Sequence, residues 1–300
     1  MRQEAYFCTV KELDELGKNN IPRQLISHTH LIYSSPATLA FNSPGAEGFG
    51  VKRAGLAVPD SVMLIVSPGC CGRNTSVLSS MRAYQDRFYY LLMDETDIVT
   101  GRHLKKIPKA VAEICEGLKK KPSVVMICIT CVDALLGTDM ERVCHKAEEY
   151  AGVPVRPCYM YALTREGRKP PMVHVRQSVY SLLEPKKKKG NVVNLLGYFS
   201  PLTDDCELYD LLHGAGVKTI HEISRCKDYA QYQTMSEANF NLVLHPEARF
   251  AAEDFHDRLK IPYIELRRLY QIDKIASQYR AFAAAPVSYT HLTLPTNSLV

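Results

Sequence analysis

The chain has 300 residues, of which 46% are hydrophobic and 23% are charged, and its formal net charge is +5. These proportions are typical of a soluble globular protein, and the length accommodates two domains with cores of their own. The sequence contains no run of about 18 apolar residues, and its N-terminal segment lacks an apolar signal core. We therefore expect a cytoplasmic protein that does not bind a membrane.

Residues 1–60 have an irregular, turn-rich pattern, and from residue 62 the pattern alternates between strand and helix. Strands are predicted at residues 62–66, 89–93, 124–129 and 153–161. Helices are predicted at residues 74–88, 104–119 and 140–151, with a loop at 94–103. This alternation predicts a first Rossmann-like domain, residues 61–185, in which helices cover both faces of a parallel sheet.

A basic segment at residues 186–191, with four consecutive lysines, separates this domain from a second one at 192–285. Without a basic stripe interleaved with aromatic residues, the lysine run indicates a solvated linker and not a nucleic-acid contact. Strands at 192–196, 217–223, 240–244 and 263–266, and helices at 205–213 and 249–259, repeat the earlier pattern. The fold class is therefore α/β, with tandem Rossmann-like, doubly wound parallel sheets and a cleft between them.

Residues 286–300 fit neither a helical nor a strand pattern. They resemble a translated sequencing adapter, and we expect a non-native tail without functional residues.

Two cysteine sites follow predicted buried strands. Cys70 and Cys71 come after the strand at 62–66, and Cys128 and Cys131 lie at the end of the strand at 124–129. Because open α/β sheets bind ligands at the carboxyl ends of their strands, these cysteines are candidate ligands of one metal cluster. Cys128 lies inside its strand, where a core thiol is the more typical role. The other six cysteines are predicted to be packing residues: Cys8, Cys115, Cys144, Cys158, Cys206 and Cys226.

Over residues 43–282 the sequence resembles nitrogenase component 1 and the nitrogenase-like oxidoreductases. SPGCCG is similar to the family's HGPxGC turn, and TDIVTGRHLKKIPKAVAEI is similar to its DVVFGGxxKL segment with the helix that follows. ITCVDALLGTDMERV is similar to its STCxxxLIGDDI segment, and VVNLLGYFSPLTDDCELYDLLHGAGVKTI to the opening of its second domain. The four motifs occur in the family's order. The resemblance implies the family's tandem fold, with its third domain missing here.

The resemblance makes Cys71 and Cys131 the cluster ligands, with Cys70 as a further candidate. Family members with the eight-iron cluster carry another cysteine upstream, and this chain has none between Tyr33 and Cys70. The ligands of the iron–molybdenum cofactor have no convincing match, so dinitrogen reduction is not expected. Because an iron–sulfur cluster usually takes four thiolates, two per chain predict one [4Fe–4S] cluster shared across a homodimer or a pseudo-symmetric heterodimer.

The resemblance also implies the activity of an oxidoreductase subunit. A separate ATP-dependent iron–sulfur reductase would deliver low-potential electrons, and the subunit would pass them to a small-molecule substrate. The chain has no GxxxxGK[ST] loop of its own. Two alternatives stay open: a scaffold for metal-cluster or cofactor assembly, and a non-redox ligand-binding protein with two lobes. Cluster transfer to an acceptor would indicate the scaffold, and the absence of iron would indicate the ligand-binding protein.

Several polar residues near these motifs are weaker candidates for substrate contact, proton donation or metal binding. They are His28, His30, Arg73, Glu95, Asp97, Arg102, His103, His174 and His245. For the arginines and His103, surface solvation is the simpler interpretation. His174 and His245 are predicted to lie on strands, where a structural role is more typical.

Overall fold

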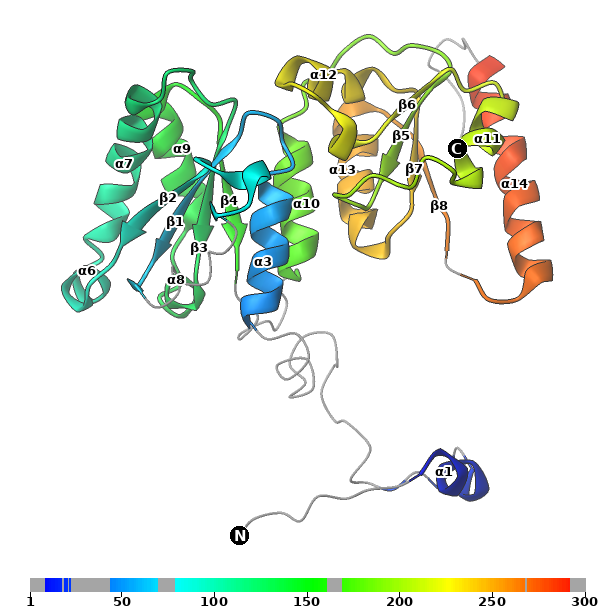
Figure 1. Cartoon of the computed structure of the whole chain (residues 1–300), viewed down its shortest axis with the longest axis horizontal. Helices are drawn as coiled ribbons and strands as arrows, with labels where there is room; N and C mark the ends of the chain where they lie inside the picture. Colours follow the sequence, from blue (N-terminus) through cyan, green and yellow to red (C-terminus); the bar gives the residue numbers. More distant parts are fainter. Residues whose placement is uncertain are drawn as a thin grey trace.

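The computed structural model describes residues 9–17, 19–20, 22, 44–69, 79–160, 169–267 and 269–291. Only the backbone is described for residues 10, 44–49, 134–135 and 283–291. Beyond a short helix α1 (Val10–Leu16), the described residues form two α/β units that lie side by side (Figure 1). None of the described helices combines the length and the apolar character needed to cross a lipid bilayer.

The first unit is built on a parallel sheet with the strand order β2-β1-β3-β4. Its strands are β1 (Val62–Ser67), β2 (Phe88–Leu92), β3 (Val125–Ile129) and β4 (Val155–Tyr159). Helices α7 (His103–Gly117) and α9 (Met140–Ala151) pack on one face, and α3 (Pro44–Gly55) and α10 (Pro171–Ser181) pack on the other. Because both faces are covered, every residue of β1 and β3 is buried, which explains their uninterrupted apolar sequences.

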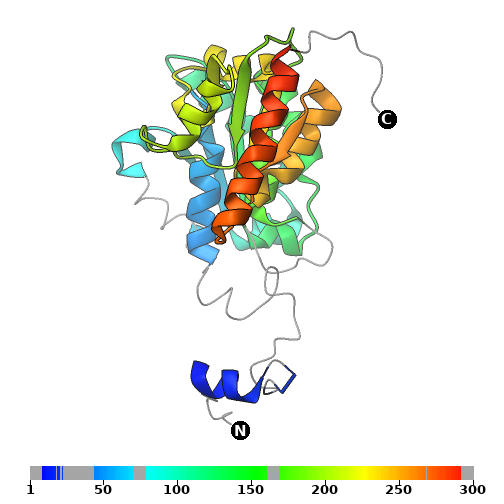
Figure 2. The same cartoon turned by 90° about the vertical axis from the view of Figure 1, so that its right-hand side faces the viewer.

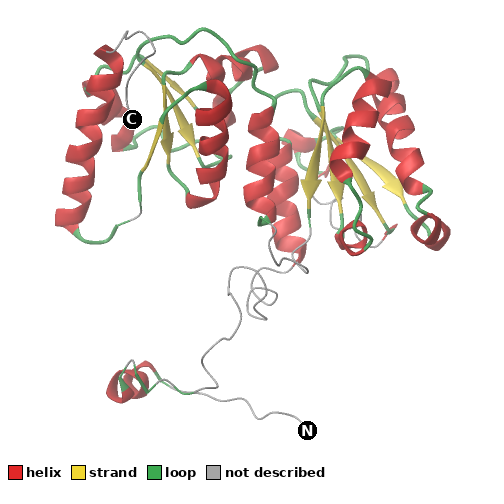
Figure 3. Cartoon of the chain, turned by 180° about the vertical axis from the view of Figure 1, so that it is seen from behind, coloured by secondary structure: helices red, strands yellow, loops and turns green. Residues whose placement is uncertain are grey.

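The second unit repeats this order as β6-β5-β7-β8, again with all strands parallel. Its strands are β5 (Val192–Leu196), β6 (Thr219–His221), β7 (Phe240–Val243) and β8 (Tyr263–Glu265). Its α-helices are α11 (Glu207–Gly214), α12 (Tyr229–Gln233), α13 (Arg249–Leu259) and α14 (Ile272–His291), with 3-10 turns η3 (Ile223–Arg225), η4 (Thr234–Glu237) and η5 (Pro246–Ala248). Figures 1 and 2 show α14 beside α11 on the outer face of this sheet, and Figure 3 shows both units from behind. The predicted tandem of doubly wound parallel sheets is confirmed.

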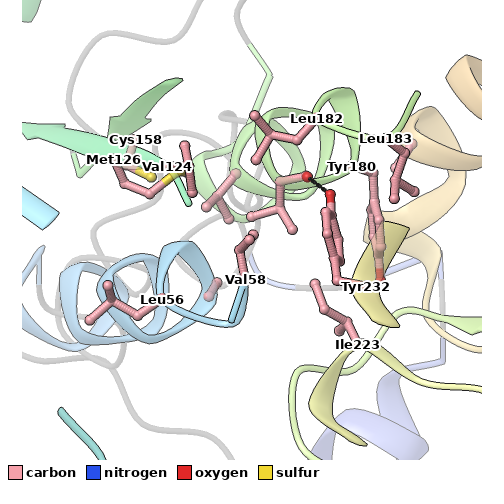
Figure 4. Packing of buried hydrophobic residues seen from close by; sticks show 14 of the residues in the cluster. Leu56, Val58, Val124, Met126, Cys158, Tyr180, Leu182, Leu183, Ile223 and Tyr232 are labelled. Carbon is pink, nitrogen blue, oxygen red and sulfur yellow. Dashed lines mark hydrogen bonds between the residues drawn. The ribbon is translucent and has the colours of Figure 1, made fainter. Parts of the chain in front are cut away.

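The two units share one hydrophobic core, which is centred on α10 (Figure 4). The last carbonyl groups of a helix have no partner within the helix, and those of α10 bond to side chains of the second unit. The Tyr232 hydroxyl donates to the Val179 carbonyl at 2.5 Å, and the Gln233 amide donates to the Leu182 carbonyl at 2.8 Å. Arg258 donates to the carbonyls of Tyr180 and Leu183. The units are thus joined by packing and hydrogen bonds as well as by the chain.

The lysine run is less solvated than predicted. Lys188 donates to the carbonyl of Ser236 at 2.6 Å, and Lys186 and Lys189 pair with Glu237. These contacts attach the linker to η4 of the second unit.

Helices α3 and α6 were predicted to be irregular or loop, and both predictions are wrong. Helix α3 lies within the segment 1–60, and its glycine-rich sequence is helical because Val51 and Ala54 pack on the sheet. Helix α6 (Glu95–Thr100) lies in the predicted loop, and it begins with a capping box between Asp94 and Asp97.

Three other expectations also differ from the structure. The predicted helix at 74–88 does not extend through its described part, where residues 82–84 form only a 3-10 turn, η2 (Arg82–Tyr84). His174 lies in α10 and not on a strand, and His245 lies two residues beyond β7. Helix α14 continues to His291, six residues into the predicted tail.

Gly197 occupies a position that requires glycine. Its φ is +135°, and a Cβ atom there would lie 2.7 Å from the backbone nitrogen of His245. We expect Gly197→Ala to lower the free energy of unfolding by about 2 kcal/mol or more, because both the strain and the clash oppose folding. Urea denaturation followed by circular dichroism measures this. Gly214→Ala is the matched control, since its Cβ would meet nothing within 4 Å; an equal loss in both variants would contradict the prediction.

Candidate functional site

The strand order of the first unit reverses between β1 and β3, and this point is where doubly wound sheets bind ligands. The two strands are direct neighbours, with Val66 opposite Ile129. Cys131 is the first residue of α8 (Cys131–Leu135), which directly follows β3. Cys70 and Cys71 follow β1 but lie outside the described residues. The topology therefore brings the strands that precede both cysteine sites to one edge of the sheet.

The described cysteines differ clearly in their surroundings. Cys131 is a partly exposed free thiol, whereas Cys128 is fully buried in the core shared by the units, as its strand position predicted. Burial raises the pKa of the thiols of Cys115, Cys144, Cys158 and Cys226, which keeps them protonated at neutral pH. This agrees with packing roles, because metals bind the thiolate.

Three buried polar atoms at the same edge have no partner in the described structure. Ser67 Oγ, Thr130 Oγ1 and Asp133 Oδ2 are buried and form no hydrogen bond to any described residue. Buried polar atoms are normally paired, so unpartnered ones at a strand edge fit a place where a bound group makes contact. Among the described residues, no three histidine, cysteine, aspartate or glutamate side chains gather as a metal site. The ligand set Cys71, Cys131 and Cys70 therefore remains a prediction.

His103 is buried and not solvated, contrary to the sequence interpretation. Its Nε2 lies 2.9 Å from Asp133 Oδ1, and its Nδ1 lies 3.0 Å from the carbonyl oxygen of Asp97. The exposed fractions of the His103 and Asp133 side chains are 1% and 0%. The pair is therefore shielded from bulk solvent, with both ring nitrogens of His103 already engaged.

Asp97 is unsuited to the proton-donor role considered for it. Lys106 and Arg102 donate to its carboxylate at 2.8 and 2.7 Å, and these hydrogen bonds hold the pKa of Asp97 well below its usual range. The carboxyl group is therefore ionised at neutral pH and has no proton to give. Arg102 is half exposed but paired, and Glu95 is exposed at the start of α6. Arg73, His28 and His30 lie outside the described residues.

The reversal point of the second unit lies between β5 and β7, and a side chain of the first unit reaches it. The guanidinium of Arg176, from α10, donates twice to the Gly197 carbonyl and pairs with Glu247 at 2.8 Å. His245 follows β7 there, with its ring edge-on to Tyr198. His174 packs edge-on against Tyr159, and burial together with the charge of Lys169 lowers the pKa of His174 to about 4. His174 is therefore neutral at pH 7.

A cavity of about 540 Å³ lies between the two units, where the sequence predicted a cleft. Both units contribute to its lining, which includes Arg53, Tyr84, Met172, Phe199, Ser224 and Lys227. Arg53 and Lys227 are exposed cations, and Ser224 Oγ is buried without a partner among the described residues. The lining also includes the carboxylate of Asp60, which pairs with Lys120, so the cations, the aromatic surface and the Ser224 hydroxyl together suit an anionic ligand of moderate size.

The sequence matches the family model of the nitrogenase component 1 type oxidoreductases over residues 47–286. Among curated proteins, it is 27% identical over 236 residues to the nitrogenase iron-molybdenum cofactor biosynthesis protein NifE of a Nostoc species, covering 76% of this chain and 48% of that protein. It is 26% identical over 263 residues to NifE of Klebsiella pneumoniae, covering 80% and 57%.

A solved structure of nitrogenase Cp1 has a similar fold, with a TM-score of 0.61 at 17% identity. The match covers 94% of this chain and 63% of that one. The chain spans about half the length of the curated relatives it matches.

Proposed function

Because the chain belongs to the nitrogenase component 1 type oxidoreductase family, we propose that it forms part of a scaffold on which a metal cluster or cofactor is assembled and then passed to an acceptor protein. The observation that carries this proposal is its similarity, over about three quarters of its length, to cofactor biosynthesis proteins. The sequence alone favours a substrate-reducing oxidoreductase, with the scaffold as an alternative. The biosynthetic relatives support the alternative better.

In this proposal Cys71 and Cys131 hold a [4Fe–4S] cluster shared with a second chain, and Cys70 is a further ligand. This position at the strand edge is supported by the free thiol of Cys131 and by the side-chain oxygens of Ser67 and Thr130, which have no partner within the described part of the chain. When bound, the cluster supplies one-electron chemistry and exchangeable iron and sulfide. This chain contributes its cysteine thiolates in a partly buried setting, and the second chain contributes the matching ligands.

The cavity between the units is the proposed place of the cargo during assembly. Metal clusters with thiolate and sulfide ligands carry negative charge, and Arg53 and Lys227 are positioned to balance it. The same cavity also fits the second candidate function, reduction of a small anionic substrate with electrons from an ATP-dependent reductase. The two functions differ in what leaves the protein: a cluster in one case and a reduced product in the other.

Transfer of labelled iron tests the scaffold function. The full chain is reconstituted anaerobically with ⁵⁵Fe and sulfide, mixed with a cluster-free nitrogenase component 1 acceptor, and separated from it by affinity tag. We expect most of the label to move to the acceptor, and no transfer from Cys131→Ser. The Cys206→Ser variant is the control, because Cys206 lies in the second unit, away from the site. Label that stays on the chain while a reductase drives product formation would refute the scaffold function.

A further inference from the structure

The segments that follow the two neighbours of β1 are connected by a buried side-chain bridge. Strands β2 and β3 are the two neighbours of β1, and they are followed by α6 and α8. His103 bonds to the Asp97 backbone in α6 through Nδ1 and to the Asp133 side chain in α8 through Nε2. The bridge therefore spans the carboxyl end of β1, from which the chain continues toward Cys70 and Cys71.

The hydrogen-bonding roles in this bridge follow from the partners. A carbonyl oxygen can only accept a hydrogen bond. His103 Nδ1 is therefore protonated and donates a hydrogen bond to the carbonyl oxygen of Asp97. One further proton lies between His103 Nε2 and Asp133 Oδ1. Thr138 Oγ1 donates to the same carboxylate oxygen at 3.2 Å. Asp133 Oδ1 is thus held by two groups, while Oδ2 has no partner among the described residues.

Helix α8 depends on such anchors because it is only five residues long. Short helices are marginal by themselves, so tertiary contacts decide where they lie. Asp133 is in the first turn of α8, two residues after Cys131, and both of its partners lie outside the helix. The anchoring of Asp133 therefore holds the first turn of α8, to which Cys131 belongs.

We propose that His103 and Asp133 are positioning residues that hold α8 so that the Cys131 thiol faces the edge shared with the other cysteine site. The proposal rests on the proposed function only in treating Cys131 as a ligand. Sequence reasoning missed this pair because the two residues are 30 positions apart and each alone resembles a surface or core residue.

Alkylation of the metal-free, reduced full chain tests this role without any cluster. The rate at which iodoacetamide modifies Cys131 is followed by peptide mass spectrometry, with Cys206 as the internal reference. In His103→Leu the anchor is lost, and we expect the Cys131 rate to change by roughly fivefold or more relative to Cys206. In His103→Gln an amide donor remains, and the rate should return to within about twofold of the wild-type rate. In a titration with Co²⁺, the thiolate-to-Co²⁺ absorption should be lost in His103→Leu and recovered in His103→Gln.

His213→Leu is the matched control, because His213 also bonds to a backbone carbonyl, that of Val217, but lies in the second unit. In His213→Leu, the rate of Cys131 alkylation should equal the wild-type rate. If His103→Leu does not fold, Thr138→Val removes only the second anchor of Asp133 and should give a smaller change, about twofold. Unchanged Cys131 rates in folded variants, or equal changes at Cys206, would overturn the positioning role. Failure of cluster transfer by a chain with normal alkylation rates would count against the proposed function alone.

Discussion

Replacement of Cys131 by serine is expected to lower the iron content of the anaerobically purified chain at least tenfold, to about a tenth or less of wild type. The thiol lies at the strand edge where the sheet order reverses, and a serine hydroxyl stays protonated at neutral pH and is a poor ligand for iron. Iron and acid-labile sulfide analysis, with electron paramagnetic resonance of the reduced protein, measures the loss. The fold should persist, because Cys131 is only partly buried.

The same result is expected for Cys71→Ser, and a smaller loss for Cys70→Ser if Cys70 is only a supplementary ligand. The matched control is Cys206→Ser, which alters another partly exposed free thiol outside the site. Full retention of iron by Cys131→Ser, with a normal circular dichroism spectrum, would show that Cys131 is not a ligand.

The second large effect is expected at Arg176, which joins the two units. Its side chain is 5% exposed, it donates to the carbonyls of Gly197 and Met172, and it pairs with Glu247. Arg176→Met keeps the length of the side chain but removes both donors from the buried Gly197 carbonyl. Glu247 is 37% exposed and can be solvated, so we expect the free energy of unfolding to fall by about 2–3 kcal/mol, mainly from the lost hydrogen bonds of a charged donor. Urea denaturation followed by circular dichroism measures it.

Arg249→Met is the control for this experiment. Arg249 pairs with Glu265 in the same unit, but its side chain is 47% exposed, so solvent screens the pair. The expected loss is below about 1 kcal/mol. Equal losses in the two variants would show that Arg176 does not join the units as the structure indicates.

The sheets could be predicted from the sequence because their central strands are continuous apolar runs that are buried on both faces. The boundaries of β5 and α13 agree with the prediction to the residue. Helix α10 was not predicted, because its apolar residues face two different units and show no single amphipathic stripe. Helix α6 was predicted as a loop, although its capping box is a local signal that the sequence contains.

The candidate site could be predicted only in part. The position of Cys131 at the carboxyl end of β3 could be predicted, because the alternation of strands and helices in the sequence determines the topology of the sheet. The contact between His103 and Asp133 could not be predicted, since it depends on how α7 and α8 meet above β1. The role of His103 was misjudged for the same reason.

The hydrogen bonds at the end of α10 have a consequence for synthesis of the chain on the ribosome. The first unit contains all of its strands by residue 159, yet Arg258, whose side chain donates to the carbonyls of Tyr180 and Leu183, comes much later in the chain. Until about 75 further residues have been made, the apolar face around Tyr180 has no Phe255 to cover it. We therefore expect the nascent first unit to be incompletely packed, with an exposed apolar face around Tyr180, until the second unit has been synthesised.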